Sequence, residues 1–239
     1  MLAAADFNSP ITWAILIGWI MSVVLHEWAH GFVAYLGGDY TIKERGGLSL
    51  NPLQYVDPIM SLLLPAIFLM MGGIPLPGGV TYIRNDLLRS RGWQSAVSLA
   101  GPMMNFILFV LLALPFHPKL GLIDPTMSVG EYKTWQIFLG AMAQLQVIAM
   151  MLNLVPLPPL DGFGVIAPYM DEETRIKVTT PPLPMFALIV MFLVLSNAQP
   201  VRDAMFHMKN RIMGLLGFDD WAIDMIRQCF NIAIAGRND

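Results

Sequence analysis

Long stretches of this chain carry almost no charge, and this restricts the available folds more than any other feature. Residues 11–25 contain no ionisable side chain. Charged residues make up 13% of the whole chain, against about 25% in ordinary soluble domains. So much apolar surface needs a non-aqueous solvent, and for a protein that solvent is the lipid bilayer. The composition therefore predicts an all-α integral membrane protein that crosses the bilayer several times.

Five apolar segments alternate with polar or Pro/Gly-rich stretches: 11–36, 57–73, 95–116, 134–156 and 183–198. The first, third and fourth exceed about 20 residues, which is enough to cross a hydrocarbon core roughly 30 Å thick. The second is shorter and contains Pro65. Residues 79–83 have the pattern of a short strand, which would add a small membrane-associated β element to the helix bundle.

The C-terminal part has a different pattern. Apolar residues recur at helical spacing between Val201 and Leu216, which predicts an amphipathic helix on the membrane surface or on the bundle. A second helix is predicted near 221–234. Because the sequence shows no internal repeat, we expect one membrane-embedded domain over 1–239. Its core would cover about 10–200, and its amphipathic segment about 201–239.

Charge and cysteine content exclude two classes of protein. The formal net charge is −3 and the basic residues are scattered, so the sequence predicts no nucleic-acid partner. A single cysteine, Cys229, excludes an intramolecular disulfide framework. The first ten residues contain no Lys or Arg, unlike a secretory signal peptide, so we expect the first apolar segment to be retained.

The sequence HEWAH, from His26 to His30, lies near the end of the first apolar segment. Positions i and i+4 of a helix share one face, so both imidazoles can reach one zinc ion, and Glu27 can serve as the general base. The alternative is a pair of interfacial histidines that cap a membrane helix. Burying these groups in lipid costs several kcal/mol unless they are paired or bound to metal. This penalty favours the metal site.

The end of the fourth apolar segment offers a third ligand. Catalytic zinc usually has three protein ligands. Residues 153–164, NLVPLPPLDGFG, contain three prolines, which prevent a regular helix. Unwound backbone at membrane depth is tolerated where it lines a cavity or is packed in protein. Asp161 is the best third ligand, and Asn153 could present its amide to a developing oxyanion. The alternative is a proline-rich loop with an Asp-Gly turn. His117 and His207 are weaker ligand candidates.

Three motifs carry a family resemblance: HEWAHG at 26–31, SLAGPMMN at 98–105 and NLVPLPPLDG at 153–162. Their order and spacing resemble the site-2 protease family of intramembrane zinc metalloproteases, in its short bacterial-type branch without a PDZ domain. The resemblance covers about residues 10–165, including the stretch 38–58. The small residues of the second motif also allow close helix packing, and Asn105 is expected to make an interhelical hydrogen bond.

The resemblance implies a function and a place for it. One Zn²⁺ ion would be bound by His26, His30 and Asp161. Glu27 would be the general base, and Asn153 would assist substrate binding or oxyanion stabilisation. The substrate would be a single-span membrane protein. The enzyme would be a multi-pass protein of the bacterial cell (inner) membrane, with its site toward the cytoplasmic face.

The sequence also departs from the family pattern at Gly47, where the family has Arg, at Tyr55, where it has His, and in a proline-valine stretch that here reads Gly79-Val80-Thr81. The first two departures motivate a second reading, in which the chain is a catalytically weak or inactive subunit that acts as scaffold or partner in a membrane complex. A metal transporter is a weaker third reading. Transport usually needs several ionisable groups along a path, and the sequence has one such cluster.

The proposed ligands set the direction of the helices. His26 lies late in 11–36 and Asp161 lies just after 134–156, so these segments should cross the membrane in the same direction. If 57–73 and 95–116 both crossed, the two segments would run in opposite directions. We therefore expect 57–73 to re-enter or to stop short of a full crossing. The alternative is that the broken end after 134–156 folds back far enough for Asp161 to reach the histidines. A further expectation is that 79–83 pairs with an unwound substrate segment.

Overall fold

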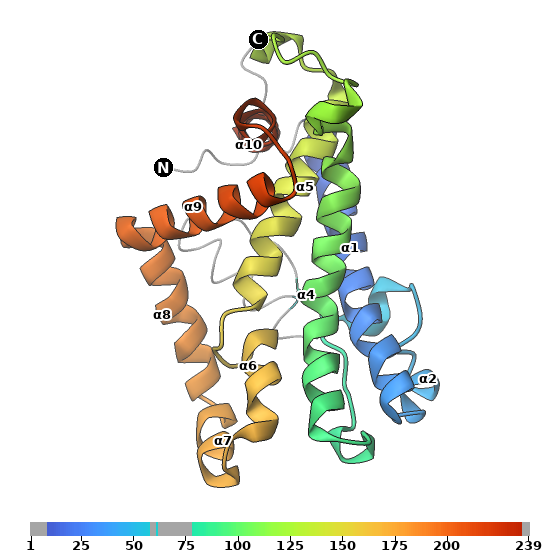
Figure 1. Ribbon diagram of the computed structural model, residues 1–239. Coiled ribbons are helices and arrows are strands. Elements are labelled where there is room, and N and C mark those ends of the chain that lie inside the picture. Colours follow the sequence, from blue (N-terminus) through green and yellow to red (C-terminus); the bar gives the residue numbers. More distant parts are fainter. Residues whose placement is uncertain (1–8, 58–60, 62–77, 236–239) are drawn as a thin grey trace.

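Three long helices form the centre of the molecule. The computed structural model describes residues 9–57, 61 and 78–235. Helices α1 (Pro10–Gly37), α4 (Arg91–Ala113) and α5 (Thr134–Asn153) pack along one another. Helices α1 and α5 run in the same direction, and α4 runs in the opposite direction (Figure 1). The direction predicted from the proposed ligands is therefore confirmed.

All three central helices are long and apolar enough to cross a membrane. Helices α7 (Glu172–Thr179) and α8 (Leu183–Asn197) meet at 66° and would count as a fourth span if taken together. No β-strand occurs in the described residues. The predicted all-α polytopic membrane fold is therefore confirmed, and the chain is a membrane protein.

Helix α1 ends where the chain turns sharply against a later segment. Gly38 has a φ of 122°, which favours glycine, and a Cβ there would lie 2.8 Å from the carbonyl oxygen of Leu87. The N–H of Arg89 donates to the carbonyl oxygen of Gly37 at 3.0 Å. The segment before α4, with its short helix η3 (Asn85–Leu87), therefore docks on the C-terminal end of α1.

The chain on either side of 62–77 lies side by side. The Ser61 hydroxyl donates to the carbonyl oxygen of Gly78 at 2.7 Å, and the N–H of Val80 donates to that of Tyr55 at 3.0 Å. The short helices α2 (Thr41–Glu44) and η1 (Pro52–Tyr55) precede this point. The described residues on the two sides of this stretch therefore meet beside Glu27 of α1. Apart from residues 57 and 61, the expected re-entrant segment 57–73 lies outside the described residues.

Residues 78–84 have no regular secondary structure, so the predicted strand at 79–83 is wrong. The Val80 N–H is bound to Tyr55, and the Thr81 hydroxyl donates to the carbonyl oxygen of Glu27 at 3.1 Å. Contacts with α1 and with the 38–57 loop hold this segment in place. The β-branched residues that suggested a strand are used in these irregular contacts.

The proline-rich break follows α5 as predicted. Helix α5 ends at Asn153, and α6 (Asp161–Ile166) starts after an irregular stretch. A Cβ on Gly162 would lie 2.3 Å from the carbonyl oxygen of Leu154, so glycine is required for the chain to fold back this tightly. The short helix η7 (Ala167–Tyr169) continues from α6.

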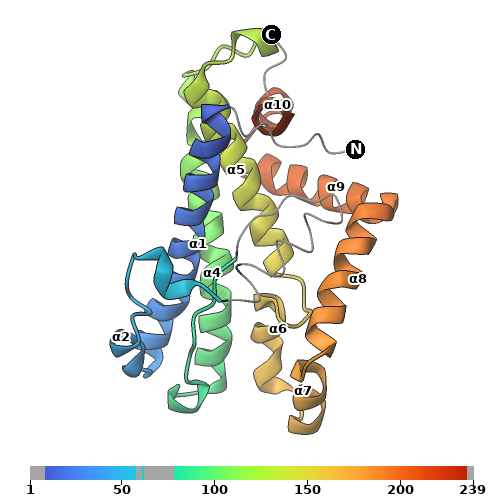
Figure 2. The ribbon, with the colours of Figure 1, turned by 180° about the vertical axis from the view of Figure 1, so that it is seen from behind.

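The other end of the bundle contains most of the apolar core. Helix α10 (Asp220–Ala235) packs against α5, where a Cβ on Gly140 would lie 2.7 Å from that of Cys229. Helix α9 (Gln199–Leu215) lies across the direction of the central helices (Figure 2). Both predicted C-terminal helices are therefore present. Short helices connect α4 to α5: η4 (Leu114–Phe116), η5 (Pro118–Leu120) and η6 (Val129–Glu131).

Lys209 of α9 is a buried cation and generates a first prediction. Its side chain is 4% exposed, and its ammonium group donates to Gln144 Oε1 at 3.3 Å. Burial, followed by the charge of Arg227, lowers the pKa of Lys209 to about 8, although Asp224 opposes the shift. The unfolded chain, with a lysine pKa of about 10.4, binds more protons between these two values. We therefore expect stability in detergent to rise from pH 8 to about pH 10, by at most on the order of 3 kcal/mol from this group.

In Lys209→Met this rise should disappear, and the variant should be more stable than the wild type at pH 7, because it removes a buried charge that forms no ion pair with a described residue. Thermal unfolding at a series of pH values is the measurement. Lys177→Met replaces an exposed lysine of α7 and is the matched control. It should keep the wild-type dependence of stability on pH. An unchanged pH dependence in Lys209→Met would contradict the assignment.

Candidate active site

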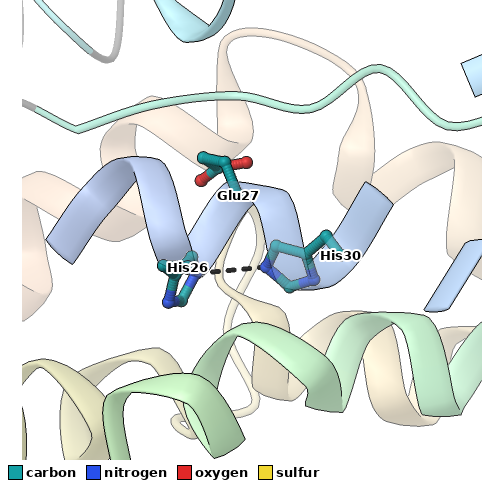
Figure 3. A group of neighbouring side chains, drawn as sticks. All are labelled: His26, Glu27 and His30. Atoms are coloured by element: carbon teal, nitrogen blue, oxygen red, sulfur yellow. Dashed lines mark hydrogen bonds between the residues drawn. The ribbon is translucent and has the colours of Figure 1, made fainter. Parts of the chain in front are cut away.

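Three ionisable side chains of α1 lie together inside the bundle. His26, Glu27 and His30 are all buried, and one ligand atom from each lies within 4.8 Å of the others. The two imidazoles point toward α4, whereas Glu27 lies on the neighbouring flank of α1 (Figure 3). The one-turn spacing of HEWAH thus gives the shared histidine face expected from the sequence.

Hydrogen bonds at Nδ1 select the tautomer of each imidazole when the ring is neutral. His30 Nδ1 lies 2.7 Å from the carbonyl oxygen of Val97, which can only accept, so Nδ1 carries the proton. His26 Nδ1 likewise donates to Asn105 Oδ1. In a neutral ring the other nitrogen, Nε2, then has a free lone pair. Such Nδ1 bonds are the usual means of orienting histidine ligands of a metal.

Asp161, at the start of α6, completes the four-residue group, which consists of His26, Glu27, His30 and Asp161. One of its carboxylate oxygens lies 3.1 Å from His26 Nε2 and the other 3.3 Å from His30 Nε2. The two Nε2 atoms are 3.1 Å apart, the contact dashed in Figure 3. When both rings are neutral, this contact joins two electron-pair donors. Asp161 Oδ2 is also buried, and it has no hydrogen-bond partner among the described residues.

These separations fit a tetrahedral zinc ion. Bonds of about 2.0–2.1 Å at a tetrahedral centre place neighbouring ligand atoms roughly 3.3 Å apart. Without a cation, two neutral imidazoles would direct two lone pairs at a carboxylate in a buried site, which is unfavourable. His26, His30 and Asp161 are therefore suited to hold one metal ion. The structure brings together all three residues that the sequence proposed as ligands, and their role as ligands stays a prediction.

A glycine of α4 makes room for this group. A Cβ on Gly101 would lie 2.3 Å from His30 Nε2 and 2.4 Å from His26 Nε2. The small residues of SLAGPMMN were expected to permit close helix packing, and here they bring α4 directly onto the histidines. The expected interhelical hydrogen bond of Asn105 is confirmed, and its partner is His26.

Segment 78–84 covers Glu27 from the side opposite to α4 (Figure 3). A Cβ on Gly79 would lie 2.9 Å from Glu27 Cγ and 3.0 Å from Val23 Cγ1. Among the described residues, the Glu27 carboxylate makes no hydrogen bond or ion pair. This buried carboxylate is therefore held by packing.

The other candidate residues lie apart from this group. Asn153 is the last residue of α5 and is half-buried, and it makes no hydrogen bond to the four residues within the described structure. His117 uses both ring nitrogens elsewhere, with the Leu216 carbonyl oxygen and the Lys119 N–H. His207 belongs to α9, on the amphipathic C-terminal segment. Neither histidine joins the metal-binding group.

Two features of the site had no clear sequence signal. The carbonyl oxygen of Val97 orients His30, but every residue has a carbonyl group, so this partner could not be identified from residue type. The sequence predicts an interhelical hydrogen bond for Asn105 but does not identify its partner, which in the structure is a ring nitrogen of His26. A polar residue in an apolar helix was the available clue.

The departures from the family pattern lie outside the four-residue group. Tyr55 is buried, and its hydroxyl donates to the carbonyl oxygen of Ser49 at 2.6 Å. Burial and then the charge of Glu27 raise its pKa to about 12, so it stays a neutral phenol. A Cβ on Gly47 would lie 2.6 Å from Ile42 Cγ1, so a larger residue would displace Ile42.

Comparison with known proteins identifies several relatives. The chain is 39% identical to the "Putative zinc metalloprotease Rip2" of Mycolicibacterium smegmatis, across 82% of this chain and 73% of that protein. It is 33% identical to the protein of the same name from Mycobacterium tuberculosis, across 98% of this chain and 83% of that protein. It is 32% identical to the "Putative zinc metalloprotease YwhC" of Bacillus subtilis, across 69% and 73%. No family model and no solved structure matches.

Adding a methyl group at Gly101 should disrupt the metal site. In Gly101→Ala the new Cβ would displace both imidazoles or push α4 away, and we expect metal affinity to fall about 10–100-fold, the effect typical of disturbed ligand support. Gly92→Ala on the same helix is the matched control, because its Cβ would meet only Ser90 Oγ at 3.6 Å. Metal analysis of both purified variants is the measurement. Equal metal content would show that the close contact is not limiting.

Removal of the Asp161 carboxylate should reduce bound zinc. We expect about one zinc ion per wild-type chain and a large loss in Asp161→Ala, because two histidines alone form an incomplete site. Asp124→Ala, an exposed aspartate in the loop between α4 and α5, is the control and should retain zinc. Equal zinc in the wild type and Asp161→Ala would overturn the third-ligand assignment.

Proposed function

This chain belongs to the site-2 protease family, with the zinc metalloproteases named Rip2 and YwhC, and from this premise we propose that it cleaves a peptide bond in or near the transmembrane segment of a membrane protein. The metalloprotease activity follows from the family. That the substrate is embedded in the membrane is a further part of this proposal. It is supported by the position of the four-residue group, which lies on and beside helices long enough to span a bilayer.

The observation that carries the proposal is the convergence of His26 Nε2, His30 Nε2 and the Asp161 carboxylate within 3.1–3.3 Å of one another. Zinc bound there would polarise the scissile carbonyl group and lower the pKa of a water molecule to about 7. The protein contributes the orientation of the three ligands through Asn105, the Val97 carbonyl oxygen and the fold of 154–160.

Glu27 is proposed as the general base and acid. Its carboxylate would accept the proton of the attacking water and later transfer it to the leaving amine. Burial favours this role because bulk water does not compete for the transferred proton in a site of low dielectric. Asn153 remains a proposed contributor to substrate binding or oxyanion stabilisation, and its place at the end of α5, just before the unwound segment, is compatible with either.

The substrate must be unwound locally, because a hydrogen-bonded helix protects its backbone from attack. Residues 79–83 were expected to pair with such an unwound segment. The Val80 N–H already bonds to Tyr55, so this donor is not free for that pairing. We further propose that the protein is a multi-pass component of the bacterial cell (inner) membrane, with its site toward the cytoplasmic face. Its substrate would be a single-span protein.

A second candidate function is a non-catalytic subunit of a membrane complex. The departures at Gly47 and Tyr55 favour it. Both positions lie outside the four-residue group, and the ligand geometry is complete without them. A scaffold would tolerate loss of the Glu27 carboxylate, whereas a protease would not, and this difference provides the test.

Glu27→Gln should retain zinc and lose proteolysis. The amide has nearly the same size as the carboxylate but cannot accept the proton, so we expect the cleavage rate to fall by about 10²–10⁴-fold. Cleavage of a model single-span substrate in reconstituted vesicles is the measurement, with zinc content determined in parallel. If the wild type binds zinc but cleaves no member of a panel of single-span substrates, the scaffold hypothesis is favoured.

A further inference from the structure

The segment over Glu27 is fixed at several points. We call residues 78–84 the Glu27 cover. Near its start, the Val80 N–H donates to the carbonyl oxygen of Tyr55 at 3.0 Å. In its middle, the Thr81 hydroxyl donates to the carbonyl oxygen of Glu27 at 3.1 Å. Gly79 packs so closely on Glu27 and Val23 that a side chain there would collide with both. A small displacement of the cover would therefore change the packing around Glu27.

The far end of the cover is bound to a fully buried carboxylate. Asp39 follows α1 directly and has no solvent exposure. Its Oδ2 accepts from the backbone N–H of Arg84 at 2.9 Å and from the Arg45 guanidinium at 2.7 Å. Its Oδ1 accepts from the Thr41 hydroxyl at 2.5 Å. Both oxygens are thus used, and one bond reaches the last residue of the cover.

Arg45 links Asp39 to the cover a second time. Its Nη2 donates to Asp39, and its Nη1 donates to the carbonyl oxygen of Tyr82 at 2.5 Å. Tyr82 in turn donates its hydroxyl to Asp57 Oδ2 at 2.8 Å. The planar guanidinium holds its donors in a fixed geometry, so one side chain sets the distance between Asp39 and the cover.

The geometry points to a positioning role: we propose that Asp39 and Arg45 hold the Glu27 cover in place, so that Glu27 is kept beside the metal ligands and shielded on its outer flank. This inference rests on the proposed function for the role of Glu27. Asp39 and Arg45 touch no reacting group. They act through the backbone at Tyr82 and Arg84, and through Thr81 and Gly79 on Glu27.

The charge state of Asp39 is consistent with this role. Burial alone would raise its pKa, but hydrogen bonds from Thr41, the Arg84 N–H and Arg45 outweigh burial and lower the pKa below the ordinary value. The carboxylate therefore stays ionised at neutral pH and accepts all three bonds. An amide at this position would present one acceptor oxygen and two N–H donors, and it could not accept all three.

The most direct test measures shielding and does not need protease activity. Val23→Cys, in a Cys229→Ala background, places a single thiol beneath Gly79, one turn from Glu27. We expect a maleimide to label this thiol slowly in membranes, and at least tenfold faster when Asp39→Asn is added. Arg45→Gln should have a similar effect. Because the Arg45 side chain is partly exposed to solvent, Arg45→Gln provides the labelling test if Asp39→Asn fails to fold.

Asp86→Asn is the matched control for the labelling. Asp86 is exposed and pairs with Arg84 at 2.7 Å, so this variant removes a neighbouring charge without touching Asp39. It should leave the labelling rate unchanged. Equal labelling in the wild-type background and in folded, zinc-containing Asp39→Asn or Arg45→Gln would overturn the proposal. So would an increase of the same size in Asp86→Asn.

Cleavage kinetics separate this proposal from the proposed function. If the chain is a protease, Asp39→Asn should keep its zinc and lower kcat about tenfold or more, with a smaller change in KM, because Glu27 is displaced while the metal ligands stay. Unchanged kcat together with faster labelling would refute the link to Glu27. If the wild type itself cleaves nothing, the proposed function fails, and the labelling result still decides whether Asp39 and Arg45 hold the cover.

Discussion

Two imidazole nitrogens and a carboxylate face one another at 3.1–3.3 Å inside this protein, and the rest of the architecture serves that convergence. Three electron-pair donors at these distances are unfavourable in a buried place unless a cation lies between them. Hydrogen bonds from both Nδ1 atoms direct the Nε2 lone pairs of the neutral rings toward Asp161. The group is thus suited to bind a metal ion.

The convergence restricts the fold around it. His26 and His30 belong to α1, whereas Asp161 follows α5. The histidine turn of α1 and the C-terminal end of α5 must therefore lie at the same depth. The two helices achieve this by running in the same direction, with α4 between them in the opposite direction. The break at 154–160 then directs Asp161 inward, and Gly101 leaves space where α4 crosses the histidines. A side chain at Gly101 or a continuous helix through Asp161 would be incompatible with the site.

Features that depend on local chemistry could be predicted from the sequence. The HEWAH spacing placed two imidazoles on one helix face, and the three prolines placed a break before Asp161. Both conclusions follow from backbone geometry that neighbouring residues determine. The strand at 79–83 was wrong because its apolar and β-branched residues contact α1 and the 38–57 loop, and no second strand is present among the described residues to pair with them. The Val97 carbonyl oxygen and Asp39 could not be identified, because their roles arise from contacts between distant segments.

A scaffold role explains the metal ligands more easily than it explains the buried position of Glu27. A structural metal site gains stability from its ligands, so His26, His30 and Asp161 alone would be compatible with a purely structural role. Glu27 is a fourth buried ionisable group that makes no hydrogen bond or ion pair with another described residue, and burying such a carboxylate destabilises the fold. Around it, α1 and the segment 78–84 are bound together through Asp39, Arg45 and Thr81. A protein that only needed a stable metal site would gain by replacing Glu27 with an apolar residue, whereas a protease needs a base at this position.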